Sequence, residues 1–264
     1  MALDVRKFVY DNITPYEWDA SFLSGPTERT NALMEEVKKY LKEERDNNGL
    51  RSVDPATIST ITSHKPGYIK KELETIVGLQ TDEPLKRAIK PFGWIRVVEK
   101  ALNERWIELD PKVKEIFKYA KNHNDAVFSA YDPEIRMYRT KHILTGLPDN
   151  YARGRIIGDY RRLALYWTDR LIEEKKADFA AITGEMDDAK VRLREEISMQ
   201  ISALKDIAEM AKSYWFDVTR PAETAQEAIQ WVYFAYLSGV KEQDGAAMSL
   251  GNVSSFLDIY IEKI

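Results

Sequence analysis

The chain contains 264 residues, carries a formal net charge of −4 and is 44% apolar. This length allows roughly one or two domains with a sizeable core. The mildly acidic balance does not favour a nucleic-acid partner, because neutralising phosphate groups requires a basic face. The sequence has no cysteine, so this chain supplies no thiol nucleophile, no disulfide and no thiolate-bound metal.

No segment of the sequence looks like a membrane anchor. The strongest apolar run, residues 231–240, is much shorter than the ~20 residues that a membrane-spanning helix needs, and we interpret it as a buried helix. The first residues lack the apolar stretch of a signal peptide. We therefore expect a soluble, cytoplasmic protein with no membrane partner.

Helix signals dominate the sequence. Three Asp-Pro pairs predict helix starts, because Asp caps free amides and Pro at the first helical position loses no hydrogen bond. These pairs are Asp54-Pro55, Asp110-Pro111 and Asp132-Pro133. Apolar residues recur at helical spacing in three segments: Leu33, Val37, Tyr40 and Leu41; Val113, Ile116, Phe117 and Ala120; and Leu193, Ile197, Ile201, Leu204 and Ala208. Thr224 begins a predicted capping box ahead of the buried run.

Strand signals are few. Residues 57–62 are β-branched but form a short run, and the small residues 246–251 make a second candidate strand. No repeat, low-complexity tract or Gly- and Pro-rich linker divides the chain. The sequence therefore predicts a mainly α fold, with residues 1–264 as a single region.

Basic residues gather in the middle of this acidic chain. Arg153 and Arg155 flank Gly154 directly before a predicted helix. Glycine lets a ligand or a second backbone approach closely, and a guanidinium group suits a carboxylate or phosphate. Two interpretations remain open at this point. The segment is either an anion site at a helix start or a solvated helix face paired with Asp159 and Asp169.

Other chemical motifs are weak. His64, His123 and His142 lack metal-ligand spacing, so we expect no metal site. We interpret the small residues 245–249 as a place of tight backbone packing. The sequence has no phosphate loop, dinucleotide fingerprint or nucleophile elbow.

Longer strings in the sequence resemble the front part of pyruvate formate-lyase (formate C-acetyltransferase), a family of glycyl-radical enzymes. The strings occur in the family's order and cover essentially all of this chain but only the front of the family's length. They are ITSH at 61–64, IVGLQT at 76–81, PLKRA at 84–88, LTGLPD at 144–149, RGRIIGDYRR at 153–162, RLREE at 192–196, AQEAIQW at 225–231, GAAMS at 245–249 and FLD at 256–258.

The resemblance implies the fold, reaction and partners. Family members are cytoplasmic homodimers that convert pyruvate and coenzyme A to formate and acetyl-CoA, with a glycyl radical installed by a radical-SAM activating enzyme. Their fold is a ten-stranded α/β barrel wrapped in helices, and this chain corresponds to its mainly helical N-terminal part. The catalytic cysteine pair and the glycyl-radical loop belong to the C-terminal portion, so the chain is expected to be truncated before them and inactive alone.

The resemblance also implies site residues. Arg155 matches the arginine that holds the pyruvate carboxylate, and Ala246 matches a small residue beside the substrate. These assignments make the anion site the better interpretation of the arginine segment. Four further residues match the face associated with coenzyme A, where an aromatic ring can stack on adenine and cations can meet phosphates. They are Phe128, Arg139, Phe179 and Lys241.

Some residues depart from the family pattern. Trp18, Trp94 and Trp167 stand where familiar members have glycine, and Ala152 replaces a glycine before the arginine pair. An indole at a position where glycine has no side chain requires local rearrangement or solvent exposure. Ile201 stands where some members have histidine, which removes a possible coenzyme contact.

Three functions are consistent with these observations. The chain is the N-terminal portion of a pyruvate formate-lyase, supplying the carboxylate-binding arginine but neither the radical nor the acyl carrier. Alternatively it is a non-catalytic module that binds a carboxylate or coenzyme A. A third possibility is a structural partner that completes a split enzyme.

Overall fold

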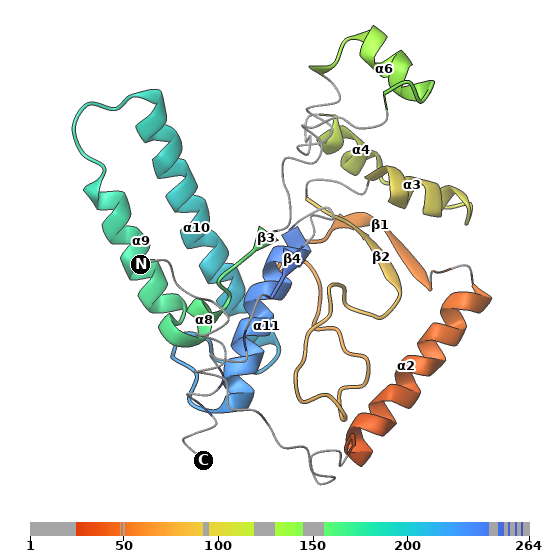
Figure 1. Cartoon of the computed structure of the whole chain (residues 1–264), viewed down its shortest axis with the longest axis horizontal. Coiled ribbons are helices and arrows are strands. Elements are labelled where there is room, and N and C mark those ends of the chain that lie inside the picture. Colours follow the sequence, from red (N-terminus) through yellow and green to blue (C-terminus); the bar gives the residue numbers. More distant parts are fainter. Residues whose placement is uncertain are drawn as a thin grey trace, which may run out of the picture.

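The computed structural model describes residues 25–47, 49, 51–91, 95–118, 130–144, 156–242, 248–250, 253, 257 and 260. Its elements are α2 (Glu28–Asp46), β1 (Ser52–Ile58), β2 (Lys86–Ile89), α3 (Ile95–Asn103), α4 (Pro111–Phe117), α6 (Pro133–Thr140), β3 (Ile156–Ile157), α8 (Arg161–Tyr166), α9 (Thr168–Ala181), α10 (Asp188–Ser213), α11 (Ala225–Glu242) and β4 (Met248–Ser249). Figure 1 shows α8 to α11 on one side of the molecule and β1, β2, α3 and α4 on the other. The predicted mainly α fold with few strands is confirmed.

The first described helix, α2, lies where the sequence predicts one. Thr27 caps it, because its hydroxyl accepts a hydrogen bond from the Thr30 backbone N–H at 3.2 Å. No residue of α2 is buried, and Leu41 in its apolar stripe is 49% exposed. The hydroxyl of Tyr40, on the same stripe, donates to the backbone carbonyl of Ile69 at 3.5 Å.

The Asp54-Pro55 pair lies inside strand β1, so the helix start predicted there is wrong. Asp54 does cap free amides, since its Oδ1 accepts from the backbone N–H groups of Ala56 and Thr57 at 3.0 and 2.9 Å. The chain then returns to parallel pairing with β2, leaving an irregularity between Val53 and Ile58. Pairing with a distant strand therefore overrides the local helix signal. The strand expected at 57–62 overlaps β1 only at its end.

A small hydrophobic cluster lies between the β1–β2 pair and helices α3 and α4. Asp110 caps α4 as predicted, its side chain accepting from the Lys112 backbone N–H at 2.8 Å. Helices α3 and α4 then pack their apolar faces onto the two strands. The buried members of the cluster are Val53, Ile89, Val98, Ala101, Leu102, Leu109 and Val113. Beyond α4, the exposed helix α6 begins after the capping residue Asp132, also as predicted.

A second, larger cluster surrounds helix α11. Trp231 and Phe234 are fully buried there, and Phe216 meets both rings edge-on with centroids 5.9 and 5.8 Å apart. The predicted apolar run is therefore the centre of the main core. The Thr224 cap is also present, because its hydroxyl accepts from the Glu227 backbone N–H at 3.2 Å. Among the described residues, no helix is long and apolar enough to cross a lipid bilayer.

An irregular segment between β1 and β2 is fastened onto this core by buried polar groups. The Tyr214 hydroxyl accepts from the Gly67 backbone N–H at 2.9 Å, and the Tyr233 hydroxyl donates to the Gly78 carbonyl at 2.9 Å. Gly67 has no room for a side chain, since a Cβ there would lie 2.3 Å from the Thr81 carbonyl oxygen. The segment thus brings residues near 80 against the end of α11.

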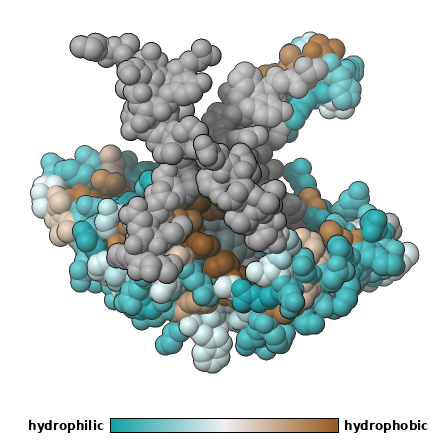
Figure 2. Space-filling view, turned by 60° about the horizontal axis from the view of Figure 1, so that its bottom comes forward, coloured by the Kyte–Doolittle hydropathy of each residue, from teal (hydrophilic) through white to brown (hydrophobic). Residues whose placement is uncertain are grey.

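The two remaining strands connect distant parts of the chain. Strand β3 pairs in parallel with β4, so that Ile156 lies opposite Met248 and Ile157 opposite Ser249. The candidate strand at 246–251 is therefore confirmed at its centre. Figure 2 shows one face of the molecule, where hydrophobic residues gather in the middle between hydrophilic margins.

Candidate functional site

Two lysines are buried together where the end of β2 meets the end of α11. Lys90, directly after β2, is 5% exposed, and Lys241 in α11 is 3% exposed. The Lys241 ammonium donates to the backbone carbonyl of Gln80 at 3.3 Å. The Lys90 ammonium has no hydrogen-bond partner among the described residues. Burying two cations in one place is costly unless anions neutralise them.

Burial lowers the pKa of both lysines. Burial lowers the pKa of Lys90 to about 8, and the charge of Lys241 acts in the same direction, while Glu242 opposes it. Burial likewise lowers the pKa of Lys241 to about 8, against the charges of Asp82 and Glu242. Both groups therefore remain mostly cationic at neutral pH.

The neighbouring carboxylates are engaged elsewhere. Glu242 Oε1 accepts from the Ile61 backbone N–H at 2.9 Å, and burial raises the pKa of Glu242. Asp82 forms an ion pair with Lys86 at 2.8 Å, and Asp54 lies 3.6 Å from the same ammonium. The nearby His64 has a buried Nε2 without a partner in the described part of the chain, and burial lowers its pKa.

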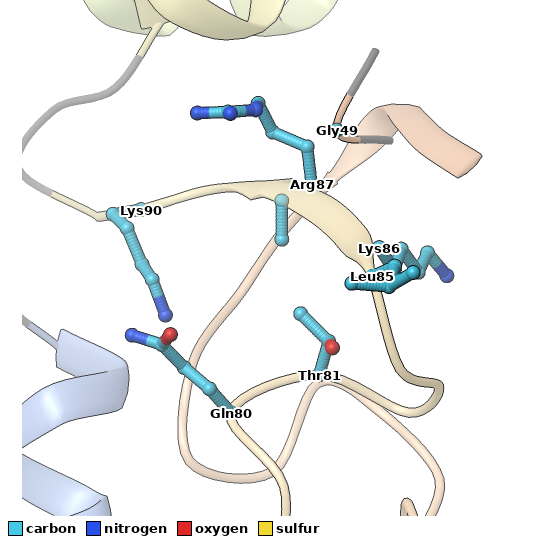
Figure 3. A pocket seen from close by; sticks show the side chains of 8 residues that line it. Gly49, Gln80, Thr81, Leu85, Lys86, Arg87 and Lys90 are labelled. Carbon is cyan, nitrogen blue, oxygen red and sulfur yellow. The ribbon is translucent and has the colours of Figure 1, made fainter. Parts of the chain in front are cut away.

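A hollow of about 190 Å³ lies beside Lys90. Its lining residues are Gly49, Gln80, Thr81, Leu85, Lys86, Arg87, Ala88 and Lys90. Figure 3 shows the Lys90 side chain extending from the strand toward Gln80, whereas Arg87 points to the opposite side of the strand. No lining residue is acidic, so the hollow is suited to an anion rather than a cation.

The three described residues predicted to face coenzyme A do not lie together. Arg139 is on the exposed helix α6, and Phe179 is on α9, whereas Lys241 is buried in α11. Figure 1 shows α6 far from both α9 and α11. One face of the Phe179 ring is covered by Arg194, whose guanidinium carbon lies 4.2 Å from the ring centroid.

Arg155, Ala246 and Phe128 lie outside the described residues. Their described neighbours nevertheless connect two of the predictions. Ile156, which directly follows Arg155, is paired with Met248, two positions after Ala246. The fold thus pairs two described strands that are far apart in the sequence. Within the neighbouring basic segment, Arg161 is half-exposed and pairs with Asp159 at 2.6 Å, as the solvated-face interpretation expects of that residue.

Sequence reasoning missed the buried Lys90. It singled out no role for this residue, because a single lysine after a short strand has no periodic pattern. For His64, the sequence predicts a local hydrogen-bonding role rather than metal binding. No group of three or more potential ligands that could hold a metal ion occurs among the residues described.

Comparison with known proteins gives the family. A family model described as "Pyruvate formate lyase-like" matches residues 3–263, so the chain belongs to the pyruvate formate lyase-like family. It is similar to the formate acetyltransferase of Haemophilus influenzae, with 54% identity over 267 residues that cover 99% of this chain and 35% of the relative. The chain therefore spans about a third of the length of that curated relative.

A solved structure supports the fold. The glycerol-bound form of the B12-independent glycerol dehydratase from Clostridium butyricum aligns with a TM-score of 0.60. The alignment covers 90% of this chain and 37% of that chain, with 16% sequence identity. At this identity the likeness shows a shared fold and nothing about the substrate.

Proposed function

We propose that this chain is the N-terminal, substrate-positioning region of a longer pyruvate formate-lyase. The proposed reaction converts pyruvate and coenzyme A to formate and acetyl-CoA in a cytoplasmic homodimer. The structural observation that carries this proposal is the β3–β4 pair, which joins the segments following Arg155 and Ala246. Membership of the pyruvate formate lyase-like family over residues 3–263 supports this reaction class.

In this proposal Arg155 holds the pyruvate carboxylate. A guanidinium group can donate two parallel hydrogen bonds to a carboxylate, which fixes both its position and its orientation. Holding the substrate in a reactive geometry lowers the entropic part of the barrier. Ala246 leaves space for the substrate on the adjoining strand segment.

Coenzyme A is proposed to approach the cluster around Lys241. Its phosphates would receive charge-assisted hydrogen bonds from this buried ammonium. Phe128 and Phe179 are proposed to offer aromatic surfaces to the adenine, and Arg139 a further cation. Because Figure 1 shows α6 apart from α9 and α11, Arg139 is proposed to serve the same coenzyme as Phe179 and Lys241 only after α6 moves.

The chain leaves the bond-breaking chemistry to another portion. When present, the glycyl radical supplies the chemistry that breaks the carbon–carbon bond of pyruvate. The absence of cysteine from this sequence means that an acyl-carrying thiol must come from elsewhere. We propose that the C-terminal portion contributes it and is activated by a radical-SAM enzyme.

Complementation tests this proposal. The chain is combined anaerobically with the remaining portion of a related enzyme and its activating enzyme, and formate release is measured. Arg155→Ala is expected to reduce formate release at least a hundredfold, and Arg155→Lys to restore part of it with a raised KM for pyruvate. Arg161→Ala, at a solvent-exposed ion pair, is the matched control. Equal activity of Arg155→Ala and the unchanged chain contradicts the proposed role.

A second candidate function is a non-catalytic anion-binding module. The observation that favours it is the Lys90 ammonium, which is buried without a hydrogen-bond partner among the described residues. Calorimetry with oxamate, an isostere of pyruvate, distinguishes the two candidates. Binding by the isolated chain that is lost in Lys90→Met, with no formate release after complementation, favours the module.

A further inference from the structure

The hollow beside β2 contains an uncompensated positive charge. Three of its eight lining residues are lysine or arginine and none is acidic. Lys86 is compensated by its ion pairs with Asp82 and Asp54. Lys90 is 95% buried and its ammonium has no hydrogen-bond partner in the described part of the chain.

No described residue forms a hydrogen bond with the Lys90 ammonium. Among the described groups that act on its charge, Lys241 is also a cation and only Glu242 is an anion. Glu242 forms no ion pair with either lysine among the described residues, and its Oε1 instead accepts from the Ile61 backbone N–H. An ammonium that has left water without gaining an acceptor is strongly disfavoured, so such a group usually has a partner.

We propose that this hollow binds a small oxyanion, with Lys90 as its principal cation. Figure 3 shows the Lys90 side chain reaching from the strand toward Gln80, and the volume of about 190 Å³ accommodates a phosphate or carboxylate group. The oxyanion is either the phosphate of a diffusible ligand or an acidic side chain from the remainder of the longer protein. This site is additional to the proposed carboxylate site at Arg155.

Titration with inorganic phosphate tests whether the hollow binds an oxyanion at Lys90. Thermal unfolding of the chain is followed at constant ionic strength, with chloride replaced stepwise by phosphate. Phosphate is expected to raise Tm, and Lys90→Met to weaken this effect at least tenfold. Lys112→Met, which removes an exposed positive charge, is the matched control and should leave the response unchanged. Equal responses in phosphate and chloride, or an unchanged response in Lys90→Met, overturn the proposal.

The same titration on the longer protein separates the two sources. If phosphate still stabilises it through Lys90, the ligand is diffusible. If phosphate has no effect there but Lys90→Met lowers Tm, an acidic side chain of the remaining portion occupies the hollow. If neither phosphate nor Lys90→Met changes Tm in the longer protein, no oxyanion is held at Lys90. These outcomes do not depend on formate release, so they are independent of the proposed function.

A second inference rests on the backbone at three tryptophans. Trp106, Trp167 and Trp215 have φ angles of 57°, 43° and 69°. Left-handed backbone is costly for residues with a side chain and unusual for bulky ones. Trp167 combines φ 43° with ψ 167°, next to a region that essentially only glycine uses.

Two of these tryptophans end helices in a motif that favours glycine. At the end of α3, the N–H groups of Trp106 and Ile107 donate to the carbonyls of Asn103 and Leu102 at 3.2 and 3.1 Å. At the end of α10, Trp215 and Phe216 donate in the same pattern to Lys212 and Ala211, both at 3.0 Å. This pair of bonds is the Schellman motif, whose left-handed residue is usually glycine.

The indole rings gain little from these positions. Trp106 is 96% exposed and Trp215 is 83% exposed, so neither ring adds to a core. Trp231 is the contrast: it is fully buried, and its indole N–H donates to the Arg220 carbonyl at 3.1 Å. Of the four described tryptophans, only Trp231 has a backbone and surroundings that suit the side chain.

We infer that positions 106, 167 and 215 are glycine in the protein that the source organism makes. A gene that uses UGA for glycine gives tryptophan at these positions when UGA is read as tryptophan, so one difference in the reading of UGA accounts for all three positions together. Trp18 and Trp94, outside the described residues, stand where the resembled family has glycine and are expected to share the codon. Trp231 is expected to be encoded by UGG.

The gene and the natural protein test this inference. The expected result is UGA at positions 18, 94, 106, 167 and 215, UGG at 231, and glycine in the corresponding peptides by mass spectrometry. UGG at all six positions overturns it. In the recombinant chain, Trp106→Gly and Trp215→Gly are expected to raise Tm by roughly 2–4 °C each, whereas Trp231→Gly lowers it. A fall in Tm for both exposed positions counts against glycine as the residue that fits.

Discussion

Gln230 and Val77 exchange two hydrogen bonds in the interior of the protein. The Val77 backbone N–H donates to Gln230 Oε1 at 2.7 Å, and Gln230 Nε2 donates to the Val77 carbonyl at 2.8 Å. Gln230 is fully buried in α11. The Gln230 side chain thus pairs with the backbone of Val77 as a neighbouring strand would. Without it, the irregular segment around Val77 would bury unpaired backbone groups.

Replacing Gln230 should therefore detach this segment. Gln230→Met fills a similar volume but leaves the Val77 N–H and carbonyl without partners, at a cost of about 2–4 kcal/mol. Urea denaturation measures the change in the free energy of unfolding. The control is Gln226→Met, because Gln226 makes an exposed bond to the Thr75 carbonyl and should cost less than ~1 kcal/mol. Similar losses for the two variants contradict this account.

Acid should weaken the Arg220–Glu227 pair. A hydrogen bond from Arg220 is the main cause that lowers the pKa of Glu227, and the two side chains pair through both carboxylate oxygens. Because the folded pKa lies below the ordinary value of 4.5, the stabilisation is complete above that value and is lost as the pH falls through the folded pKa. Glu227→Gln should lose less stability than the unchanged chain between about pH 5 and pH 3. Identical acid profiles contradict the prediction.

Mild alkali should stabilise the protein through Lys90 and Lys241. The pKa values of Lys90 and Lys241 are about 8 when folded, against 10.5 ordinarily. The unfolded chain therefore binds more protons above pH 8, and stability should rise with pH. Measurements between about pH 8 and pH 9.5 avoid the range where buried tyrosines titrate. In Lys90→Met this rise should be smaller, and a slope equal to that of the unchanged chain rejects the prediction.

The two hydrophobic clusters should respond separately to cavities. Leu102 is fully buried in the cluster beneath β1 and β2, and Leu102→Ala should cost about 2–5 kcal/mol locally. Hydrogen exchange is expected to accelerate in β1, β2, α3 and α4 while α11 keeps its protection. Phe234→Ala, in the cluster around α11, is the comparison and should expose α8 to α11. A uniform acceleration after Leu102→Ala would show one cooperative unit instead.

Local signals predicted the helices well, because their caps and apolar spacing lie within each segment. Asp110 and Asp132 both cap helices as expected. Asp54 shows the limit of this reasoning: its carboxylate caps amides in the same way, yet the chain continues as a strand. The chain continues as a strand there because Ile58 pairs with Ile89 in β2. Ile89 is far away in the sequence, so this pairing leaves no local pattern.

The candidate site was predictable only in part. Lys241 was identified through the resemblance, and its burial follows from the apolar run of α11. The burial of Lys90 depends on the segment near residue 80 folding onto α11 through Tyr214 and Gly67. Contacts between distant residues of this kind cannot be derived from spacing in one sequence, so the second lysine was missed.

The β3–β4 pair has a consequence for how the protein folds. Each strand contributes two residues, and Ile156 and Met248 are widely separated in the sequence. Closing so long a loop for so few hydrogen bonds is entropically unfavourable, so this contact should form late, after α8 to α11 have packed. Such a small parallel sheet is not stable alone. We therefore expect the segments beside Arg155 and Ala246 to become ordered in the final folding phase, coupled to the arrival of further strands.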